Sequence, residues 1–244
     1  MATLKHTTFD ALRRLRWRAN SALGRDVHFR PDVRVRSVAV GGRPENGYGA
    51  WQVVTDGLGA DSVVYAVGIG DDISFDRGIA ARLGCEIHAV DPTPEALAWL
   101  ETQPLPERYT VLPVALAAED GEVTLFPHVE PGWVSHSMLP VAHTTSDGVT
   151  VPARRLATLM AEHGHGHVDL LKLDIEGAEY AVIDDLAQSG LDVRQILVEF
   201  HHRFAEIGPE ATRGAVHTLQ RLGYRIFHVS PRGEEYGFIH QSAL

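Results

Sequence analysis

The chain has a single cysteine, Cys85, among its 244 residues, so no disulfide framework can form within it. That composition is typical of proteins from a reducing compartment. No apolar run reaches the ~20 residues that a helix needs to cross a bilayer, and the N-terminus lacks the basic-then-apolar order of a secretory signal. We therefore expect a cytoplasmic protein with no membrane span.

Basic residues are also scarce. The sequence has 22 Lys and Arg against 32 Asp and Glu, a formal net charge of −10. A nucleic-acid-binding surface needs a basic stripe, so we expect no nucleic-acid partner. A nucleoside-containing cofactor is still compatible with this charge, because a small site depends on the few charges that surround it.

Residues 1–61 predict a small helical and hairpin addition to the main domain. Within them, residues 8–23 repeat apolar side chains on one helical face and carry arginines on the other. The basic face fits an exposed surface, and a membrane-surface or partner-binding helix is the alternative. Residues 24–61 are rich in Gly, Pro, Asn and Asp, which indicates short strands and turns.

Residues 62–244 alternate between strand and helix patterns, which predicts one α/β domain: a mainly parallel sheet with helices on both faces. Strands are expected at 62–67, 86–91, 109–116, 122–126, 168–174, 194–200, 223–229 and 235–240. Helices are expected at 72–83, 94–102, 153–163, 178–188 and 209–222. Residues 127–148 form a long, irregular loop, and loops of this length are usually functional or mobile.

The last two expected strands, 223–229 and 235–240, are joined by a tight turn and predict an antiparallel C-terminal hairpin. A parallel sheet that finishes in such a hairpin is unlike a simple dinucleotide-binding fold. It is similar to the ending of class I S-adenosylmethionine-dependent methyltransferases, which have a Rossmann-like sheet.

The first strand of this domain ends in a glycine turn, Gly68-Ile69-Gly70, followed by Asp71 and Asp72. Glycines without a Cβ let backbone N–H groups approach a ligand closely. Two carboxylates would repel a pyrophosphate by several kcal/mol at ~4 Å and an effective dielectric near 20. The sulfonium and ammonium of S-adenosylmethionine tolerate acids, so the turn favours this cofactor. The alternative is that Asp71 and Asp72 only cap the next helix.

Asp91 and Pro92 follow the second strand, where the acid is placed to accept hydrogen bonds from both ribose hydroxyls and the proline to lie against the adenine. This signal alone does not separate S-adenosylmethionine from NAD. Upstream, Tyr48 and Trp51 lie beside a flexible Gly-Ala backbone. These aromatics either fill the core or form a lid over the cofactor.

Three carboxylates, Asp174, Glu176 and Glu179, follow the strand expected at 168–174. Acids this close together are costly unless they pair, bind a cation or cap a helix. Lys172 is a possible partner for one of them. The alternative is that all three only cap and solvate a helix start.

The strand expected at 194–200 delivers Glu199, His201 and His202 to the same edge of the sheet. We expect no metal here, because compact spacing such as His-x-x-x-His is absent. His201 is a candidate general base or substrate clamp, with a structural hydrogen bond as the alternative. The histidines between His163 and His167 are expected to be surface loop residues.

The segments 171–179, 151–156 and 198–201 together resemble the FkbM-type methyltransferases, and the block 64–99 looks like a methyltransferase-like branch of that group. The likeness covers roughly residues 46–202. It implies the class I fold, S-adenosylmethionine as cofactor, and O-methylation of a hydroxyl on a sugar, polyketide or other small natural product.

The resemblance and the residues together assign provisional roles. Asp174, His201 and Glu199 are the positions for a catalytic base; the cofactor is expected at Gly68, Gly70, Asp71, Asp72, Asp91, Pro92, Tyr48 and Trp51; the acceptor is expected at Glu176, Ser135, His136, Ser137 and His202. A homodimer is possible. The alternatives are a Rossmann-type NAD-dependent oxidoreductase, a non-catalytic protein that kept the fold, and metal-assisted methyl transfer.

Overall fold

The computed structural model describes residue 17 and residues 19–42, 49–130 and 134–244. Tyr48 and most of the helix expected at 8–23 lie outside the described residues. Residues 19–22 are helical, in agreement with the C-terminal end of that expected helix.

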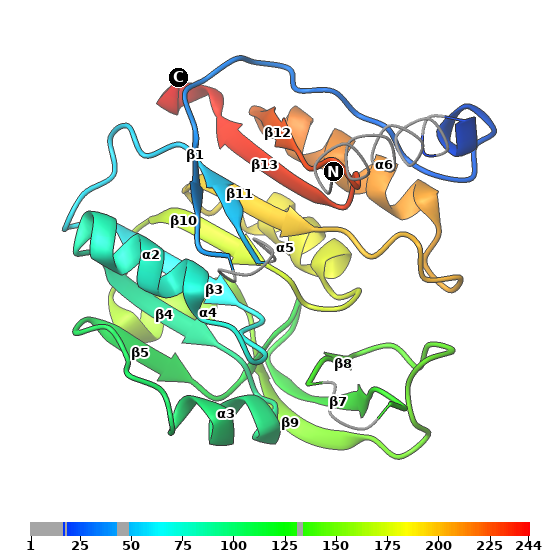
Figure 1. Ribbon diagram of the computed structural model, residues 1–244, viewed down its shortest axis with the longest axis horizontal. Helices are drawn as coiled ribbons and strands as arrows, with labels where there is room; N and C mark the ends of the chain where they lie inside the picture. Colours follow the sequence, from blue (N-terminus) through cyan, green and yellow to red (C-terminus); the bar gives the residue numbers. More distant parts are fainter. Residues whose placement is uncertain (1–16, 18, 43–48, 131–133) are drawn as a thin grey trace, which may run out of the picture.

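A seven-stranded sheet forms the centre of the fold, with strand order β12-β13-β11-β10-β3-β4-β5 (Figure 1). Its strands are β3 (Val63–Val67), β4 (Glu86–Val90), β5 (Tyr109–Leu112), β10 (Val168–Leu173), β11 (Val193–Glu199), β12 (Tyr224–Val229) and β13 (Glu235–His240). Neighbours from β5 to β11 pair in parallel. Strand β13 is antiparallel to both β11 and β12. The predicted parallel sheet and antiparallel C-terminal hairpin are therefore confirmed.

Helices cover both faces of this sheet, as expected. The helices are α2 (Ser74–Leu83), α3 (Pro94–Leu100), α4 (Leu156–His163), α5 (Glu179–Ser189) and α6 (Pro209–Arg221). Apolar side chains of α4, α5 and α6 share one core with the sheet. Side chains of α2 pack on the other face, together with the hairpin β1 (Val38–Val40) and β2 (Trp51–Val53). Figure 1 shows α2 in front of the sheet and α4 behind it. Strand β10 is buried at every position, as its near-continuous apolar sequence requires between two helical layers.

A second sheet has four strands in the order β6-β9-β7-β8. Of its strands, β7 confirms the strand expected at 122–126, but the sheet itself was not predicted. Its strands are β6 (Ala115–Leu116), β7 (Gly121–Pro127), β8 (His136–Ser137) and β9 (Val149–Arg154). The strand expected at 109–116 is split at Pro113, which has no N–H to donate to a ladder. The helix expected from residue 153 begins at Leu156, because β9 continues to Arg154 and pairs with β7. The supposed irregular loop 127–148 thus contains β8 and leads into β9.

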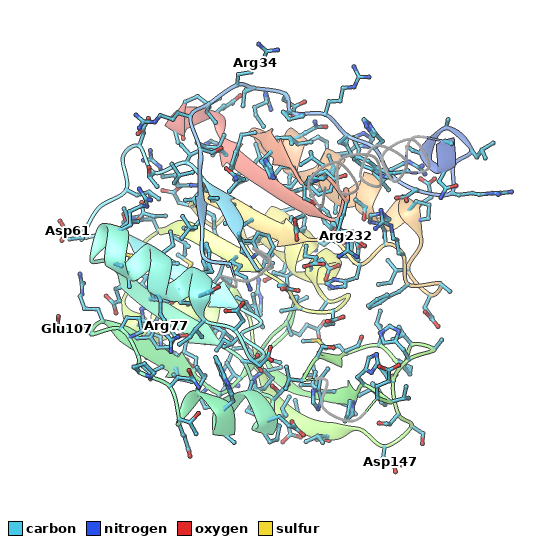
Figure 2. All side chains as sticks on the ribbon, in the orientation of Figure 1. Arg34, Asp61, Arg77, Glu107, Asp147 and Arg232 are labelled. Carbon is cyan, nitrogen blue, oxygen red and sulfur yellow. The ribbon has the colours of Figure 1, made fainter. Side chains whose placement is uncertain are left out.

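No helix in the described part of the chain is long and apolar enough to cross a bilayer. Figure 2 shows the charged side chains of Arg34, Asp61, Glu107 and Asp147 projecting outward from the rim of the fold. The division of the chain at residues 61 and 62 stays a prediction.

The buried amide of Gln195 links the segment after β2 to the central sheet. Its Oε1 accepts a hydrogen bond from the Val54 backbone N–H at 2.9 Å, and its Nε2 donates to the Val54 carbonyl oxygen at 3.1 Å. The Gln195 side chain is completely buried on β11. A buried polar group is stable only when it is hydrogen-bonded, so each residue satisfies the other.

We expect Gln195→Leu to lower the free energy of unfolding by about 2–4 kcal/mol, because it leaves a buried N–H and a buried carbonyl of Val54 without partners. Urea denaturation followed by circular dichroism measures this loss. The matched control is Gln188→Leu on the exposed face of α5, for which we expect a change within about 0.5 kcal/mol. Equal stabilities of the two variants would contradict the linking role of Gln195.

Candidate active site

A cleft of about 450 Å³ lies at the carboxyl edge of the parallel strands. The segments that follow β3, β4 and β10 line it together with Glu199, the last residue of β11. Residues 134–136, Met138 and Trp51 close it from the sides. Ligands of open α/β sheets bind at this edge, where adjacent strands deliver side chains and free backbone groups. The volume falls within the range of small-molecule sites.

The glycine turn after β3 packs directly against the chain after β10. Gly68 has a φ of +80°, and a Cβ at this position would lie 1.7 Å from the carbonyl oxygen of Asp174. Gly70 also has a left-handed φ, of +57°. Lys172 Nζ donates a hydrogen bond to the Gly68 carbonyl oxygen at 2.9 Å. The turn therefore needs glycine for both its conformation and its close contact.

Asp91 holds this turn from the side of β4. Its Oδ2 accepts hydrogen bonds from the backbone N–H groups of Ile69 at 2.8 Å and Gly70 at 3.0 Å. Its Oδ1 accepts from the N–H and the hydroxyl of Thr93, at 2.9 and 2.7 Å. Asp91 and Pro92 both line the cleft, so contact with the nucleoside stays a prediction. The turn-holding role of Asp91 was not predicted.

Asp71 and Asp72 both line the cleft beside the turn. Asp72 Oδ1 also accepts a hydrogen bond from the backbone N–H of Ser74, the first residue of α2, at 2.8 Å. Asp72 therefore both contacts the start of α2 and lines the cleft, so the helix contact and the cleft position do not exclude each other.

The sequence predicted Lys172 only as a possible partner for the carboxylates after β10, and its Nζ does lie 3.9 Å from Asp174 Oδ2. The residue is 8% exposed and lines the cleft, and its Nζ lies 5.4 Å from the centre of the Trp51 ring. Trp51 is itself largely buried on β2 and lines the cleft. A lysine in a buried strand, and one of only two lysines in the sequence, is a signal that could have identified a role in the cleft.

The cleft is strongly acidic. Among its described lining residues, Lys172 is the one Lys or Arg, whereas the lining carboxylates are Asp71, Asp72, Asp91, Asp174, Glu176, Glu199 and Glu235. Glu235 was not predicted; it starts β13 and lies opposite Glu199 in the β11–β13 register. A cavity lined by charge of one sign concentrates ligands of the opposite sign, so the cleft favours a cation.

His201 lies beside the cleft carboxylates Asp174 and Glu176, and the fully buried Glu179 fixes its position. Glu179 Oε1 accepts from the His201 backbone N–H at 2.9 Å and lies 3.3 Å from Nδ1. His201 Nε2 lies 3.5 Å from Glu176 and 4.0 Å from Asp174. Burial alone would lower the pKa of His201, but the hydrogen bond to Glu179 and the three carboxylate charges raise it to about 10. His201 is therefore an imidazolium at neutral pH.

The carboxyl groups beside His201 are harder to ionise than usual. Burial, and next the charge of Asp174, raise the pKa of Glu199 well above its ordinary value. Burial also raises the pKa of Glu176 and of Glu235. A carboxyl whose pKa is shifted toward neutrality can both release and accept a proton, as a general base must.

The loop residues predicted to contact an acceptor lie on one side of the cleft. Ser135 and His136 line it, and His136 Nε2 is 3.7 Å from Glu95. Ser137 is buried, and its hydroxyl donates to the Glu176 carbonyl oxygen at 2.7 Å. Glu176 itself has a φ of +51°, a conformation that non-glycine residues rarely adopt and that costs free energy. Ser137 thus supports the backbone of Glu176.

The structure does not bring His202 to the cleft. Its side chain is 1% exposed, and its Nε2 lies 2.8 Å from Oδ1 of Asp26 in the N-terminal segment. The side chains of His201 and His202 point in different directions after β11, so only His201 approaches the carboxylates beside the cleft. The predicted acceptor contact of His202 therefore has no support in the structure.

A family model described as the methyltransferase FkbM domain matches residues 62–226. The chain belongs to this family. The sheet order, the C-terminal hairpin and the helices on both faces agree with the class I methyltransferase fold.

Two curated proteins share this domain at low identity. The chain is 25% identical over 175 residues to "Probable methyltransferase-like protein 24" of Rattus norvegicus and 24% identical to the protein of that name from Homo sapiens. Each match covers 68% of this chain and 42% of the relative, so the chain spans less than half of the relatives' length.

Solved structures are more distant. The Methanococcus jannaschii fibrillarin pre-rRNA processing protein aligns with 75% of this chain and 68% of its own, with a TM-score of 0.47 and 12% identity. The precorrin-6y C5,15-methyltransferase of Geobacter metallireducens GS-15 aligns with 74% of this chain and 80% of its own, with a TM-score of 0.42 and 12% identity. Likenesses of this size carry no argument about the function of this chain.

The cofactor of this FkbM methyltransferase domain is S-adenosylmethionine, and the cleft fits it. The Gly68 turn forms a cradle that a Cβ would fill, and the surrounding carboxylates suit a ligand with a sulfonium and an ammonium. A diphosphate would meet Asp71 and Asp72 instead. The dinucleotide alternative is therefore set aside.

We expect Gly68→Ala to weaken binding of S-adenosylhomocysteine by more than about tenfold, which corresponds to 1.4 kcal/mol, because the new Cβ would displace the Asp174 backbone. Isothermal titration calorimetry measures the dissociation constant. Gly59→Ala is the control, since a Cβ there meets nothing within 4 Å. Unchanged affinity in Gly68→Ala would show that the turn does not shape the cofactor site.

We expect the stabilising contribution of His201 to depend on pH. Its pKa rises from about 6.5 in the unfolded chain to about 10 in the folded one. The contribution is complete below about pH 6.5, decreases as the pH rises, and is lost above about pH 10. The difference in unfolding free energy between the wild type and His201→Gln should therefore shrink across this window. A difference that stays constant from pH 6 to 10 would exclude a charged His201.

Proposed function

We propose that this domain transfers a methyl group to the hydroxyl oxygen of a small molecule, such as a sugar or polyketide, with Glu199 as the general base. The observation that carries the proposal is the Glu199 carboxyl group, which lines the cleft and has a pKa raised by burial and by Asp174. Proton removal by such a group contributes about 10²–10⁴-fold to a rate.

The strand order supports separate places for cofactor and acceptor. Asp91 and Pro92 follow β4, whereas Glu199 is the last residue of β11, and β3 and β10 lie between these two strands. Three strand spacings of ~4.8 Å separate the two ends by about 14 Å. We assign the nucleoside to the β4 end and the acceptor to the β11 end, with Asp174 of the β10 tip between them.

When bound, S-adenosylmethionine supplies a methyl group on a positively charged sulfur. The protein's own residues orient the partners and handle the proton. Lys172 and Asp91 hold the glycine turn in shape, and a Glu199 carboxylate oxygen accepts the acceptor's hydroxyl proton. Burial, and next the charge of Asp174, keep the Glu199 pKa high enough for this task. Positioning of this kind supplies much of the catalysis of a displacement reaction.

His201 acts as a positioning residue in this proposal, not as the base. An imidazolium has no free lone pair to accept a proton, and the surrounding carboxylates keep His201 in that form at neutral pH. Its charge offsets those of Asp174 and Glu176, at 4.0 and 3.5 Å. Glu176, Ser135 and His136 are the proposed acceptor contacts.

An acceptor that carries an amine is the second candidate, because the acidic wall of Asp174, Glu176, Glu199 and Glu235 suits a cation. We also propose that this methyl transfer is the activity of the whole protein, and that the protein is cytoplasmic and forms a homodimer. The curated relatives are longer than this chain, so regions beyond the shared domain can contribute to acceptor choice.

We expect Glu199→Gln to lower the turnover number by about 10²–10⁴-fold while the dissociation constant for S-adenosylhomocysteine stays within about twofold. Turnover is measured by mass spectrometry on a panel of sugar and polyketide hydroxyls and matched amines. The control is Glu101→Gln, an exposed carboxyl at the end of α3, with unchanged turnover.

Three results would contradict this function. Wild-type turnover in Glu199→Gln would exclude Glu199 as base and transfer the role to Asp174. Methylated amines without methylated hydroxyls would replace the proposed acceptor by the second candidate. Cofactor binding without methylation of any panel member would favour a non-catalytic cofactor-binding protein.

A further inference from the structure

A second cluster of polar side chains lies toward the amino ends of the parallel strands, whereas the cleft lies at their carboxyl ends. Glu86 and His88 come from β4, and His165 comes from the connection between α4 and β10. One potential ligand atom from each of the three lies within 4.8 Å of the other two. None of these residues lines the cofactor cleft.

His88 is the unusual member of this cluster. Its side chain is 1% exposed, and within the described part of the chain neither of its ring nitrogens makes a hydrogen bond. Its Nε2 nevertheless lies 3.0 Å from Glu86 Oε1. Two ligands about 2.1 Å from one tetrahedral ion are about 3.4 Å apart, so a shift of a few tenths of an ångström would place both on one metal. Nδ1 of His88 has neither a hydrogen bond nor an ion-pair contact within the described part of the chain, and Nε2 faces only Glu86, so this buried ring is a candidate ligand for an ion.

His165 is oriented as metal-binding histidines usually are. Its Nδ1 lies 2.9 Å from the hydroxyl of the fully buried Tyr65. A metal-bound histidine characteristically uses its second nitrogen for such a hydrogen bond, which fixes the ring. The ring centroid of His165 lies 4.6 Å from that of His88, and Nε2 of His165 is the nitrogen that the Tyr65 hydroxyl does not use.

Two further groups border the cluster. His163, the last residue of α4, has its ring centroid 4.7 Å from that of His88 and is the residue placed to supply a fourth ligand. Gly164 and Gly166 flank His165, and the space beside both is open, so this short segment can adjust to an ion. Arg108 lies 3.6 Å from the other oxygen of Glu86, which leaves Oε1 facing His88.

We propose that Glu86, His88 and His165 form a binding site for one divalent transition-metal ion, with Zn²⁺ as the best match, and that His163 completes the coordination. Two imidazoles and one carboxylate are a ligand set that zinc uses in proteins. The ion would connect β4 to the α4–β10 segment, and an ion that binds the folded chain alone raises its stability.

Zn²⁺ titration of the tag-free chain, followed by calorimetry, tests the site, and thermal melting gives a readout that does not depend on methyl transfer. We expect one Zn²⁺ per chain and a higher melting temperature. Co²⁺ should give the visible absorption bands of a four-coordinate ion.

Variants locate the ion. His165→Gln should weaken Zn²⁺ binding by more than about tenfold and abolish the thermal shift, and Tyr65→Phe should weaken it by about 10–100-fold through loss of the orienting hydrogen bond. His167→Gln is the matched control, because His167 is exposed and lies beside Asp169 instead; its binding should stay within about twofold of the wild type. No binding to the wild type, or equal binding in His165→Gln, would overturn the site. If His165→Gln does not fold, the Zn²⁺ affinity of Tyr65→Phe tests the site instead, and an affinity equal to that of the wild type would overturn it.

Discussion

The attachment of the glycine turn to its two neighbouring strands is the constraint on which the site depends. Asp91 of the β4 tip accepts hydrogen bonds from the turn's N–H groups, and Lys172 of β10 donates to its carbonyl oxygen. The Gly68 position has no room for a Cβ against Asp174. Three strand ends are thereby fixed at one edge of the sheet, and the cleft is the space that they enclose.

Charge balance is the second constraint, because the cleft gathers many carboxylates around one lysine. Lys172 and the imidazolium of His201 are the positive charges placed within this group, and Glu179 keeps His201 charged. Burial of acids without such partners would cost several kcal/mol. The remaining negative charge matches a cationic cofactor, so the bound molecule itself would relieve part of the repulsion. The charges of the cleft therefore affect both the stability of the fold and the binding of the cofactor.

Much of the fold could be predicted because its signals are local. The apolar strand that ends at Gly68, the buried strand 168–173 and the C-terminal hairpin each appear in the sequence as a short pattern, and the structure agrees with all three. The second sheet could not be predicted in this way. Its β6 and β8 strands have two residues each, too few to show a period, and they are strands only because β7 and β9 pair with them.

By itself, the sequence determined the order of strands and helices, the glycine turn and the acids that follow each strand, because these depend on side-chain periodicity and backbone freedom. Only the tertiary structure decided which of those acids share a cleft. Adjacent residues such as His201 and His202 go to different environments, one among carboxylates and the other against Asp26. The pairing of His201 with Glu179, or of His88 with His165, joins residues that are distant in the chain. Their protonation depends on burial and on neighbours, and both exist only once the chain has folded.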